Sequence, residues 1–451
     1  MPHVDLHGLP MTCASAEAAT AFNATITGYL KYRADTAARV KDMLDADPGF
    51  ALGQTVKGYF AMLSFKQANV PMAVEALAAA RAVSATATRR EQAHVAALEH
   101  WIKGDLDRTL ATWEEILDVH PTDVLAFRLH HFNAFWLGRA DVMVREVEEA
   151  MPQWSRELPG WGSLLACRCF AHEESGDYAL AEPAGREAIA LDKGDLWAAH
   201  AVAHVMEMQG RHADGIAWLA DLEPHWNGGN NLMHHLWWHR GLYHLERREF
   251  DEVLGLYDRR FRNLQSPLTQ SQPDLYIDVQ NAASMLFRLE RQGVDVGTRW
   301  DEVADKAETR IGDCLSAFTL PHWMMALAAT RRFDAAGRMI EGMRTFAAHD
   351  ERTLAPVVRD YALPISEAVV ARAKGDYAGA CALMRPAIEG MYRLGGSHAQ
   401  QDVLEQLFLD CAVAADSEED ARQLLERVKS RHPVSPEQRI GYAEAARRVA
   451  H

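Results

Sequence analysis

Three helix-turn-helix units follow one another in FAHEESGDYALAEPAGREAIALDKGDLWAAHAVAHVMEMQGRHADGIAWLADLEPHW (residues 170–226) and NNLMHHLWWHRGLYHLERREFDEVLGLYDRRF (residues 230–261). Each first helix is expected to end in a short turn, with the sequence SGDY, QGRH or RREF. The second helix then begins with small or acidic residues, which suit a helix N-terminus. This segment therefore predicts antiparallel helix pairs.

Turn glycines recur at a nearly constant distance along the chain. Gly104, Gly138, Gly176 and Gly210 are separated by 34, 38 and 34 residues, close to the period of about 34 that is typical of tetratricopeptide repeats. Alanine and glycine also stand where neighbouring helices would touch. One helix pair cannot bury its apolar face alone, whereas a stack of pairs can. The spacing predicts a superhelical array of tetratricopeptide-like helix pairs, with an irregular helical bundle as the alternative.

The remaining sequence continues this pattern. Further units are expected at residues 100–123, 331–343, 373–391 and 417–433. Convincing strand patterns with Asn-Gly or Asp-Gly turns are lacking, so we expect an all-α protein with no substantial sheet. Our interpretation is a single tetratricopeptide-like helical-repeat domain over residues 1–451. It contains a loose N-terminal lead-in and four irregular loops, expected near residues 1–14, 223–231, 263–273, 293–299 and 348–356.

Composition excludes several classes of function. The chain has 451 residues and a formal net charge of −16, which argues against binding to nucleic acid or to anionic membranes. No apolar run of about 18 residues predicts a membrane span, and the first residues do not resemble a signal peptide. The six cysteines are scattered, which favours reduced, buried thiols over a disulfide framework. We therefore expect a cytoplasmic protein.

Several longer segments are more specific than general repeat positions, and on them the chain resembles the tetratricopeptide repeat protein 38 family. The resemblance implies a cytosolic, soluble helical-repeat protein and implies no particular activity. It extends from about residue 10 to the C-terminus. The segments that carry it are TRREQAHVAALE (88–99), HPTDVLAF (120–127), HFNAFWLG (131–138), WAAHAVAHVMEMQGRHADG (197–215), HHLWWHRGLYHLE (234–246), GVDVGTRWDEV (293–303) and LGGSHAQQDVLEQL (394–407).

Histidine gives the strongest hint of chemistry. The chain has 21 histidines, and two pairs have i,i+4 spacing, His200/His204 in HAVAH and His235/His239 in HLWWH. On a helix this spacing places both imidazoles on one face. Both pairs fall on first helices of their units, which line the concave surface in tetratricopeptide stacks. We therefore expect the four rings to converge on one hollow.

Polar residues on other first helices are expected to point into the same hollow. His131 is preferred to His130 because adjacent helical residues point about 100° apart. Nine residues are candidate catalytic groups, as proton carriers, ligands or orienting carboxylates: His131, His200, His204, Glu207, His235, His239, Asp278, His322 and Asp402. Aromatic side chains that could wall the cavity are Trp197, Trp226, Trp237, Trp238, Trp323, Tyr243 and Tyr276.

Three hypotheses remain open for the histidines. Two H-x₃-H pairs with a carboxylate could bind a divalent metal such as zinc, for which the candidates are His200, His204, His235 and His239. HAVAH lacks the Glu of the H-E-x-x-H motif, so this is not a zincin signature. Alternatively, histidines oriented by carboxylates could form an acid/base pocket that needs no cofactor. The third hypothesis is a structural role in helix packing.

Two functions follow, and the sequence leaves open whether the protein is an enzyme. The first is an aromatic-walled, His/Asp/Glu-rich concave pocket that binds a small polar molecule and catalyses hydrolysis, elimination or proton transfer. The second is a non-catalytic interaction scaffold that binds a partner peptide in the concave groove. An enclosed pocket with converging titratable groups would favour the first. Whether the chain forms a homodimer is also left open.

Overall fold

The computed structural model describes residues 3–349 and 351–449. Helices dominate, and the one sheet in the described part consists of two short antiparallel strands, β1 (His3–Val4) and β2 (Pro10–Met11). The predicted all-α class is therefore confirmed. Residues 1 and 2 of the predicted lead-in and residue 350 of the fourth predicted loop lie outside the described residues.

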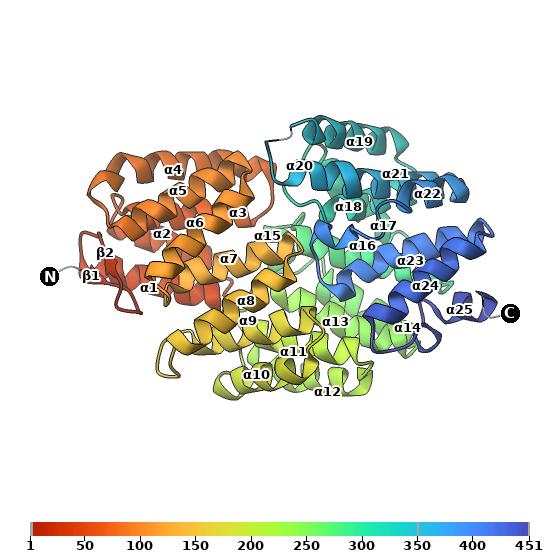
Figure 1. Cartoon of the computed structure of the whole chain (residues 1–451), viewed down its shortest axis with the longest axis horizontal. Coiled ribbons are helices and arrows are strands. Elements are labelled where there is room, and N and C mark those ends of the chain that lie inside the picture. The colour runs from red at the N-terminus through yellow and green to blue at the C-terminus, as the bar shows by residue number, and fades with distance from the viewer. Residues whose placement is uncertain (1–2, 350, 450–451) are drawn as a thin grey trace. The chain divides into compact units, whose positions relative to one another are not determined.

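The chain divides into two compact units (Figure 1). The first comprises Met1–Ala201, His225–Leu232 and Asp350–Leu354, and the second comprises Val202–Pro224, Met233–His349 and Ala355–His451. One boundary falls inside the helix α11 (Leu196–Met208), and two others follow Leu232 and Leu354, the first residues of α13 (Leu232–Glu246) and α20 (Leu354–Val357).

Antiparallel helix pairs build the first unit. Within each pair, the two helices pack along one another, as α1 does on α2, α3 on α4, α5 on α6 and α9 on α10. The helices are α1 (Ala16–Leu30), α2 (Thr36–Ala46), α3 (Ala51–Leu63), α4 (Val70–Val83), α5 (Arg89–Lys103), α6 (Leu106–Val119), α7 (Val124–Trp136), α8 (Ala140–Ala150), α9 (Trp161–Glu174), α10 (Tyr178–Leu191) and the start of α11 (Leu196–Met208).

The second unit continues with the same kind of pair. The first helices of successive pairs lie against one another, α16 on α18 and α18 on α21, as predicted for a tetratricopeptide-like stack. Its helices are α12 (His212–Leu222), α13 (Leu232–Glu246), α14 (Phe250–Leu256), α15 (Pro267–Ser271), α16 (Tyr276–Arg291), α17 (Arg299–Glu308), α18 (Thr319–Ala329), α19 (Phe333–Ala347), α20 (Leu354–Val357), α21 (Leu363–Ala373), α22 (Tyr377–Met384), α23 (His398–Ala414), α24 (Glu418–Arg431) and α25 (Ala443–Val449).

The turn glycines end their helices in the left-handed conformation. Gly104, Gly138, Gly176 and Gly210 have φ angles of 82°, 67°, 80° and 67°. This conformation is strained for residues that carry a Cβ atom, so glycine is favoured at these C-terminal caps. The observed geometry explains why glycine recurs with the period of the repeat.

Small residues allow helices to pack closely, as the sequence predicts. A Cβ atom built on Gly215 of α12 would come within 2.4 Å of the Tyr243 ring on α13. The Tyr243 hydroxyl in turn donates a hydrogen bond to the carbonyl oxygen of Ala203 on α11, at 2.6 Å. These contacts hold α11, α12 and α13 together and fix the two helices that carry most of the candidate histidines.

Two predicted loops contain short helices that the sequence analysis did not predict. Pro267–Ser271 forms α15 inside the expected loop 263–273, and Leu354–Val357 forms α20 at the end of the expected loop 348–356. The first of these helices begins with Pro267, a position where the missing backbone N–H costs nothing. No described helix combines the length and apolar character needed to cross a membrane.

Candidate functional site

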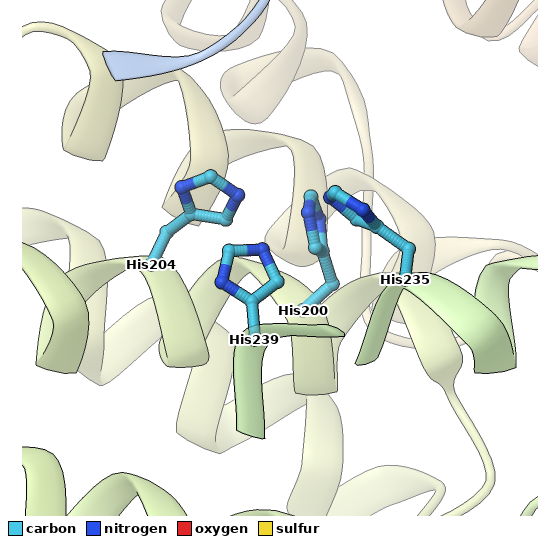
Figure 2. Close-up of side chains that lie close together, drawn as sticks. All are labelled: His200, His204, His235 and His239. Carbon is cyan, nitrogen blue, oxygen red and sulfur yellow. The ribbon is translucent and has the colours of Figure 1, made fainter. Parts of the chain in front are cut away.

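Three predicted histidines form a buried cluster in the second unit. His204 comes from α11, and His235 and His239 come from one face of α13. Their ligand nitrogens all lie within 4.8 Å of one another, and the three side chains are at most 2% exposed. Figure 2 shows these rings, and it also draws His200, one turn earlier on α11. The i,i+4 spacing of His235 and His239 thus gives the shared face that the sequence predicts.

Neighbouring side chains fix the orientation of the histidine rings. The Trp238 ring stacks on that of His235, with centroids 5.0 Å apart and an interplanar angle of 13°. His235 Nδ1 lies 2.8 Å from Asn281 Oδ1 on α16. His239 Nδ1 lies 3.8 Å from Glu207 Oε2 on α11. Each of these two rings therefore presents its Nδ1 atom to an oxygen of another helix.

Burial keeps the cluster uncharged. It lowers the pKa of His239 to about 3 and holds the pKa values of His204 and His235 well below their usual range. The positive charge that each ring would carry also opposes protonation of its neighbours. At neutral pH all three imidazoles are neutral, which is the form that accepts protons or binds metals.

A polar pocket lies next to the cluster, within the second unit, and Glu207 belongs to its lining. The pocket has a cavity volume of about 30 Å³ and is partly open to solvent. Its lining residues come from α11, α12, α13, α16, α23 and the connections around them: Glu207, Met208, Gly210, His212, Leu242, Leu245, Glu246, Arg288, Ala399, Asp402, His432, Val434 and Arg439. This lining contains no tryptophan or tyrosine, whereas Trp238, one of the predicted wall residues, stacks on His235 in the adjoining cluster.

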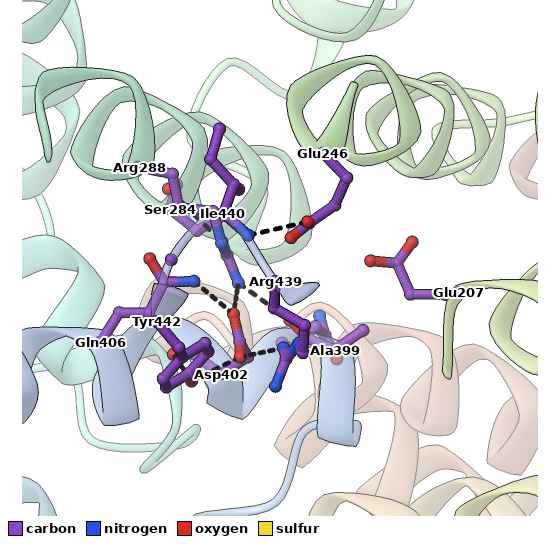
Figure 3. A network of polar contacts seen from close by, with 12 residues as sticks. Glu207, Glu246, Ser284, Arg288, Ala399, Asp402, Gln406, Arg439, Ile440 and Tyr442 are labelled. Carbon is purple, nitrogen blue, oxygen red and sulfur yellow. Dashed lines mark hydrogen bonds and ion pairs between the residues drawn. The ribbon is translucent and has the colours of Figure 1, made fainter. Parts of the chain in front are cut away.

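Asp402 is the centre of a charged network in the pocket (Figure 3). Its carboxylate accepts hydrogen bonds from the guanidinium groups of Arg288 and Arg439, from the Tyr442 hydroxyl at 2.6 Å and from the Gln406 amide at 2.7 Å. Burial alone would raise the pKa of Asp402, but Arg439 and Arg288 hold it below its usual range. Asp402 therefore remains ionised and fixes both arginines in place.

Two further carboxyl groups face this network from other helices. Figure 3 shows Glu246 of α13 and Glu207 of α11 extending toward the space beside Arg439. Burial raises the pKa of Glu246 to about 7 and that of Glu207 also to about 7. Glu246 Oε2 accepts the backbone N–H of Ile440 at 3.0 Å. A carboxyl group with a pKa near 7 can both donate and accept a proton at neutral pH.

Glu246 predicts a specific pH dependence of stability. Its pKa is raised from 4.5 to about 7 on folding, so the folded chain retains a proton that the unfolded chain releases between these pH values. The stabilisation from this group is present below pH 4.5 and is lost as the pH rises toward 7. Glu246→Gln mimics the protonated form. We expect the melting temperature of this variant to rise relative to that of the wild type as the pH increases from 4.5 to about 7. Parallel melting-temperature curves from pH 4.5 to 8 would contradict this.

The other predicted site residues lie elsewhere. His131 is in the first unit, where its Nδ1 atom lies 3.3 Å from Glu146 Oε2. His130 Nδ1 contacts the same carboxylate at 2.8 Å. Glu146 reaches both imidazoles because its two oxygens serve different rings.

Asp278 and His322 are in the second unit but do not line the pocket. Asp278 contacts His234 Nδ1 at 3.0 Å, and His234 is 1% exposed. His322 Nδ1 lies 2.9 Å from the Phe318 carbonyl oxygen of its own helix. Both contacts satisfy buried polar groups, which is the structural role that the third sequence hypothesis assigns to histidines.

Sequence reasoning missed the residues that define the pocket, namely Glu246, Arg288 and Arg439. Arg288 and Glu246 stand near the C-terminal ends of α16 and α13, and Arg439 lies between α24 and α25. No sequence motif contains these residues, because Glu246 and Arg439 are far apart in the sequence and come together only in the folded chain. The sole local signal is the charge of Arg288 and Glu246 on helices already expected to line the concave surface.

A second group of potential ligand atoms, from Asp402, Glu405 and His432, is close enough to hold a metal ion. However, the two carboxylates of this group already form ion pairs with arginines. Asp402 is bound by Arg288 and Arg439 as described, and Arg431 lies 3.3 Å from Glu405. Their positive charges oppose a cation here, so this group is better described as an ion-pair network.

Comparison with known proteins adds little to this geometry. Models of known protein families give no match to the chain. Among solved structures, the chain is similar to one titled "Structure of Naa15/Naa10 bound to HypK-THB", with a TM-score of 0.25 and 14% sequence identity over 90% of this chain and 68% of that chain. A likeness this distant supports no argument about function, and the helical architecture rests on the described helices themselves.

Proposed function

We propose that the second unit binds a small polar molecule in the pocket beside Arg439 and is equipped for acid/base chemistry there. The observation that carries this proposal is the convergence of Glu246 and Glu207, with pKa values raised to about 7, on a pocket that also contains Arg288 and Arg439. Perturbed carboxyl groups gathered in a pocket are typical of catalytic acids and bases.

The pocket provides complementary roles for the ligand. The Nη1 atom of Arg439 is buried and has no hydrogen-bond acceptor among the described residues, so it can donate to an oxygen of the ligand. Glu246 lines the same pocket as Arg439 and can accept or donate a proton. Asp402 holds Arg439 and Arg288 rigidly, which reduces the entropic cost of orienting these donors. An oxygen-binding cation and a titratable carboxyl group together can support hydrolysis, elimination or proton transfer.

Glu246→Gln tests the proposal directly. A thermal-shift screen of the chelator-treated protein with small hydroxy acids, amino acids and amides should give a compound that raises the melting temperature of the wild type. We expect Glu246→Gln to bind that compound at least tenfold more weakly, because it removes a charge-assisted hydrogen bond worth about 1.5–3 kcal/mol. The matched control is Glu252→Gln on the exposed face of α14, which should bind as the wild type does.

The screen also addresses the scaffold hypothesis. If no small molecule binds and an extended peptide library alone shifts the melting temperature, the non-catalytic peptide scaffold becomes the better interpretation. Equal binding by wild type and Glu246→Gln would remove this carboxyl group from the site.

Two further statements are proposals of the same kind. We propose that the chain belongs to the tetratricopeptide repeat protein 38 family, on the sequence segments that resemble it, and that it is cytoplasmic. Microscopy of the tagged protein tests the second, and analytical ultracentrifugation measures whether the chain forms the homodimer that the sequence leaves open. The proton chemistry assigned to the pocket needs no cofactor, and we propose a divalent metal such as zinc only for the histidine cluster.

A further inference from the structure

We propose that His204, His235 and His239 bind one divalent transition-metal ion of the zinc class. The site would adjoin the pocket through Glu207, which lines the pocket and contacts His239. It extends the function proposed above, but it rests on different residues and does not depend on the pocket's ligand.

The geometry of the three rings fits a metal centre. Zinc–imidazole bonds of about 2.0–2.1 Å place tetrahedral ligand nitrogens about 3.4 Å apart. The observed nitrogens are within 4.8 Å of one another, so each pair has to close by at most about 1.4 Å, which small rotations of the side chains supply. Two ligands share α13 and the third comes from α11, which packs against it through Tyr243.

Oxygen atoms behind the rings supply the support that metal-bound histidines require. A histidine that donates its Nδ1 proton to an acceptor carries the metal-binding lone pair on Nε2. Asn281 Oδ1 is such an acceptor for His235, at 2.8 Å. Glu207 Oε2 lies behind His239 Nδ1 at 3.8 Å, a distance that closes to a hydrogen bond with a small shift of the side chain. Asn281 thus occupies, and Glu207 approaches, the position of the acceptor that orients a metal-bound imidazole.

The chemistry of the donor set selects the metal. Imidazole nitrogens suit zinc, copper, iron, cobalt and nickel, whereas magnesium and calcium prefer oxygen ligands. Arg288, whose positive charge acts on His239, forms an ion pair with Asp402 at 3.2 Å, and Glu207 Oε2 lies 3.8 Å from His239 Nδ1.

Cobalt binding provides the test, because tetrahedral Co²⁺ absorbs visible light. We expect the full-length, chelator-treated protein to bind one equivalent of Co²⁺ with visible d–d bands that an equivalent of Zn²⁺ abolishes, while Mg²⁺ has no effect. His239→Gln should weaken binding at least 100-fold. His225→Gln, at an exposed position, is the matched control and should bind as the wild type does.

A second variant guards against misfolding of His239→Gln. Asn281→Leu leaves all three ligands in place but removes the acceptor behind His235, and loss of such a partner weakens metal binding about 10–100-fold. Folded wild-type protein that binds less than one equivalent of Co²⁺, or binding unchanged in both site variants, overturns the proposal. Glu246→Gln separates the two proposals, since it should lose the pocket's ligand and keep the metal.

Discussion

Replacement of Asp402 by alanine is expected to lower the free energy of unfolding by about 3–5 kcal/mol, the range measured when one partner of a buried ion pair is removed. The Asp402 side chain is 7% exposed and pairs with Arg288, which is 3% exposed, and with Arg439, which is 15% exposed. Without the carboxylate, two largely buried guanidinium groups would face each other with no compensating charge. The Tyr442 hydroxyl and the Gln406 amide would also lose their acceptor.

Urea titration followed by far-ultraviolet circular dichroism measures this effect. Arg422→Ala is the control, because Arg422 and Glu418 form an ion pair on the exposed face of α24 at 3.8 Å and exposed substitutions of this kind change stability by about 0.5 kcal/mol or less. If Asp402→Ala is no more destabilising than this control, the network does not hold the second unit together.

Trp113→Ala is expected to cost about 3–5 kcal/mol in the first unit, as large aromatic-to-alanine changes in protein cores do. Trp113 is fully buried, and its indole N–H donates to the Tyr59 hydroxyl at 3.1 Å. Its ring packs edge-on against Trp101, with centroids 5.6 Å apart. The substitution leaves a cavity between α5 and α6 and takes a hydrogen-bond donor from Tyr59.

The same urea titration applies, with Val119→Ala as control because Val119 is 71% exposed. Equal stability of Trp113→Ala and this control would show that the helix pair can collapse into the vacated space. Together, Trp113→Ala and Asp402→Ala test the predicted single domain. One domain implies that both variants shift the same transition, whereas independent units imply that each variant shifts its own.

The architecture was predictable because its determinants are local. Gly104, Gly138, Gly176 and Gly210 end helices through their own backbone conformation, which depends on the residue type and not on distant contacts. Small residues such as Gly215 also signal close helix packing within one unit of the sequence. The short helices α15 and α20 were missed because each contains a proline and, at five and four residues, is too short to show helical periodicity.

The candidate site was predictable only in part. His235 and His239 share a face because a helix places i and i+4 side by side, and this is legible in the sequence. Glu246 gives no such signal in the sequence. It is a candidate because burial raises its pKa, and this burial exists only in the folded chain. Arg439 reaches Asp402 from a connection outside the main helices, so helix patterns could not place it. His131 lies in the first unit. The sequence could not show this, because the repeat pattern gives no information about which helix pairs cluster together.

The connection between α24 and α25 contributes residues to the pocket, so limited proteolysis of this connection can report whether the pocket is occupied. Arg439, Ile440 and Tyr442 contact Asp402 and Glu246 from a connection that follows α24, and this connection passes through the exposed Pro433. A protease cut there would separate the guanidinium group from its carboxylate while α23 and α24 stay intact. Exposed connections of this kind are preferred sites of cleavage. A molecule that bridges Arg439 and Glu246 would tie the segment down, so occupancy of the pocket would be recorded as resistance to digestion.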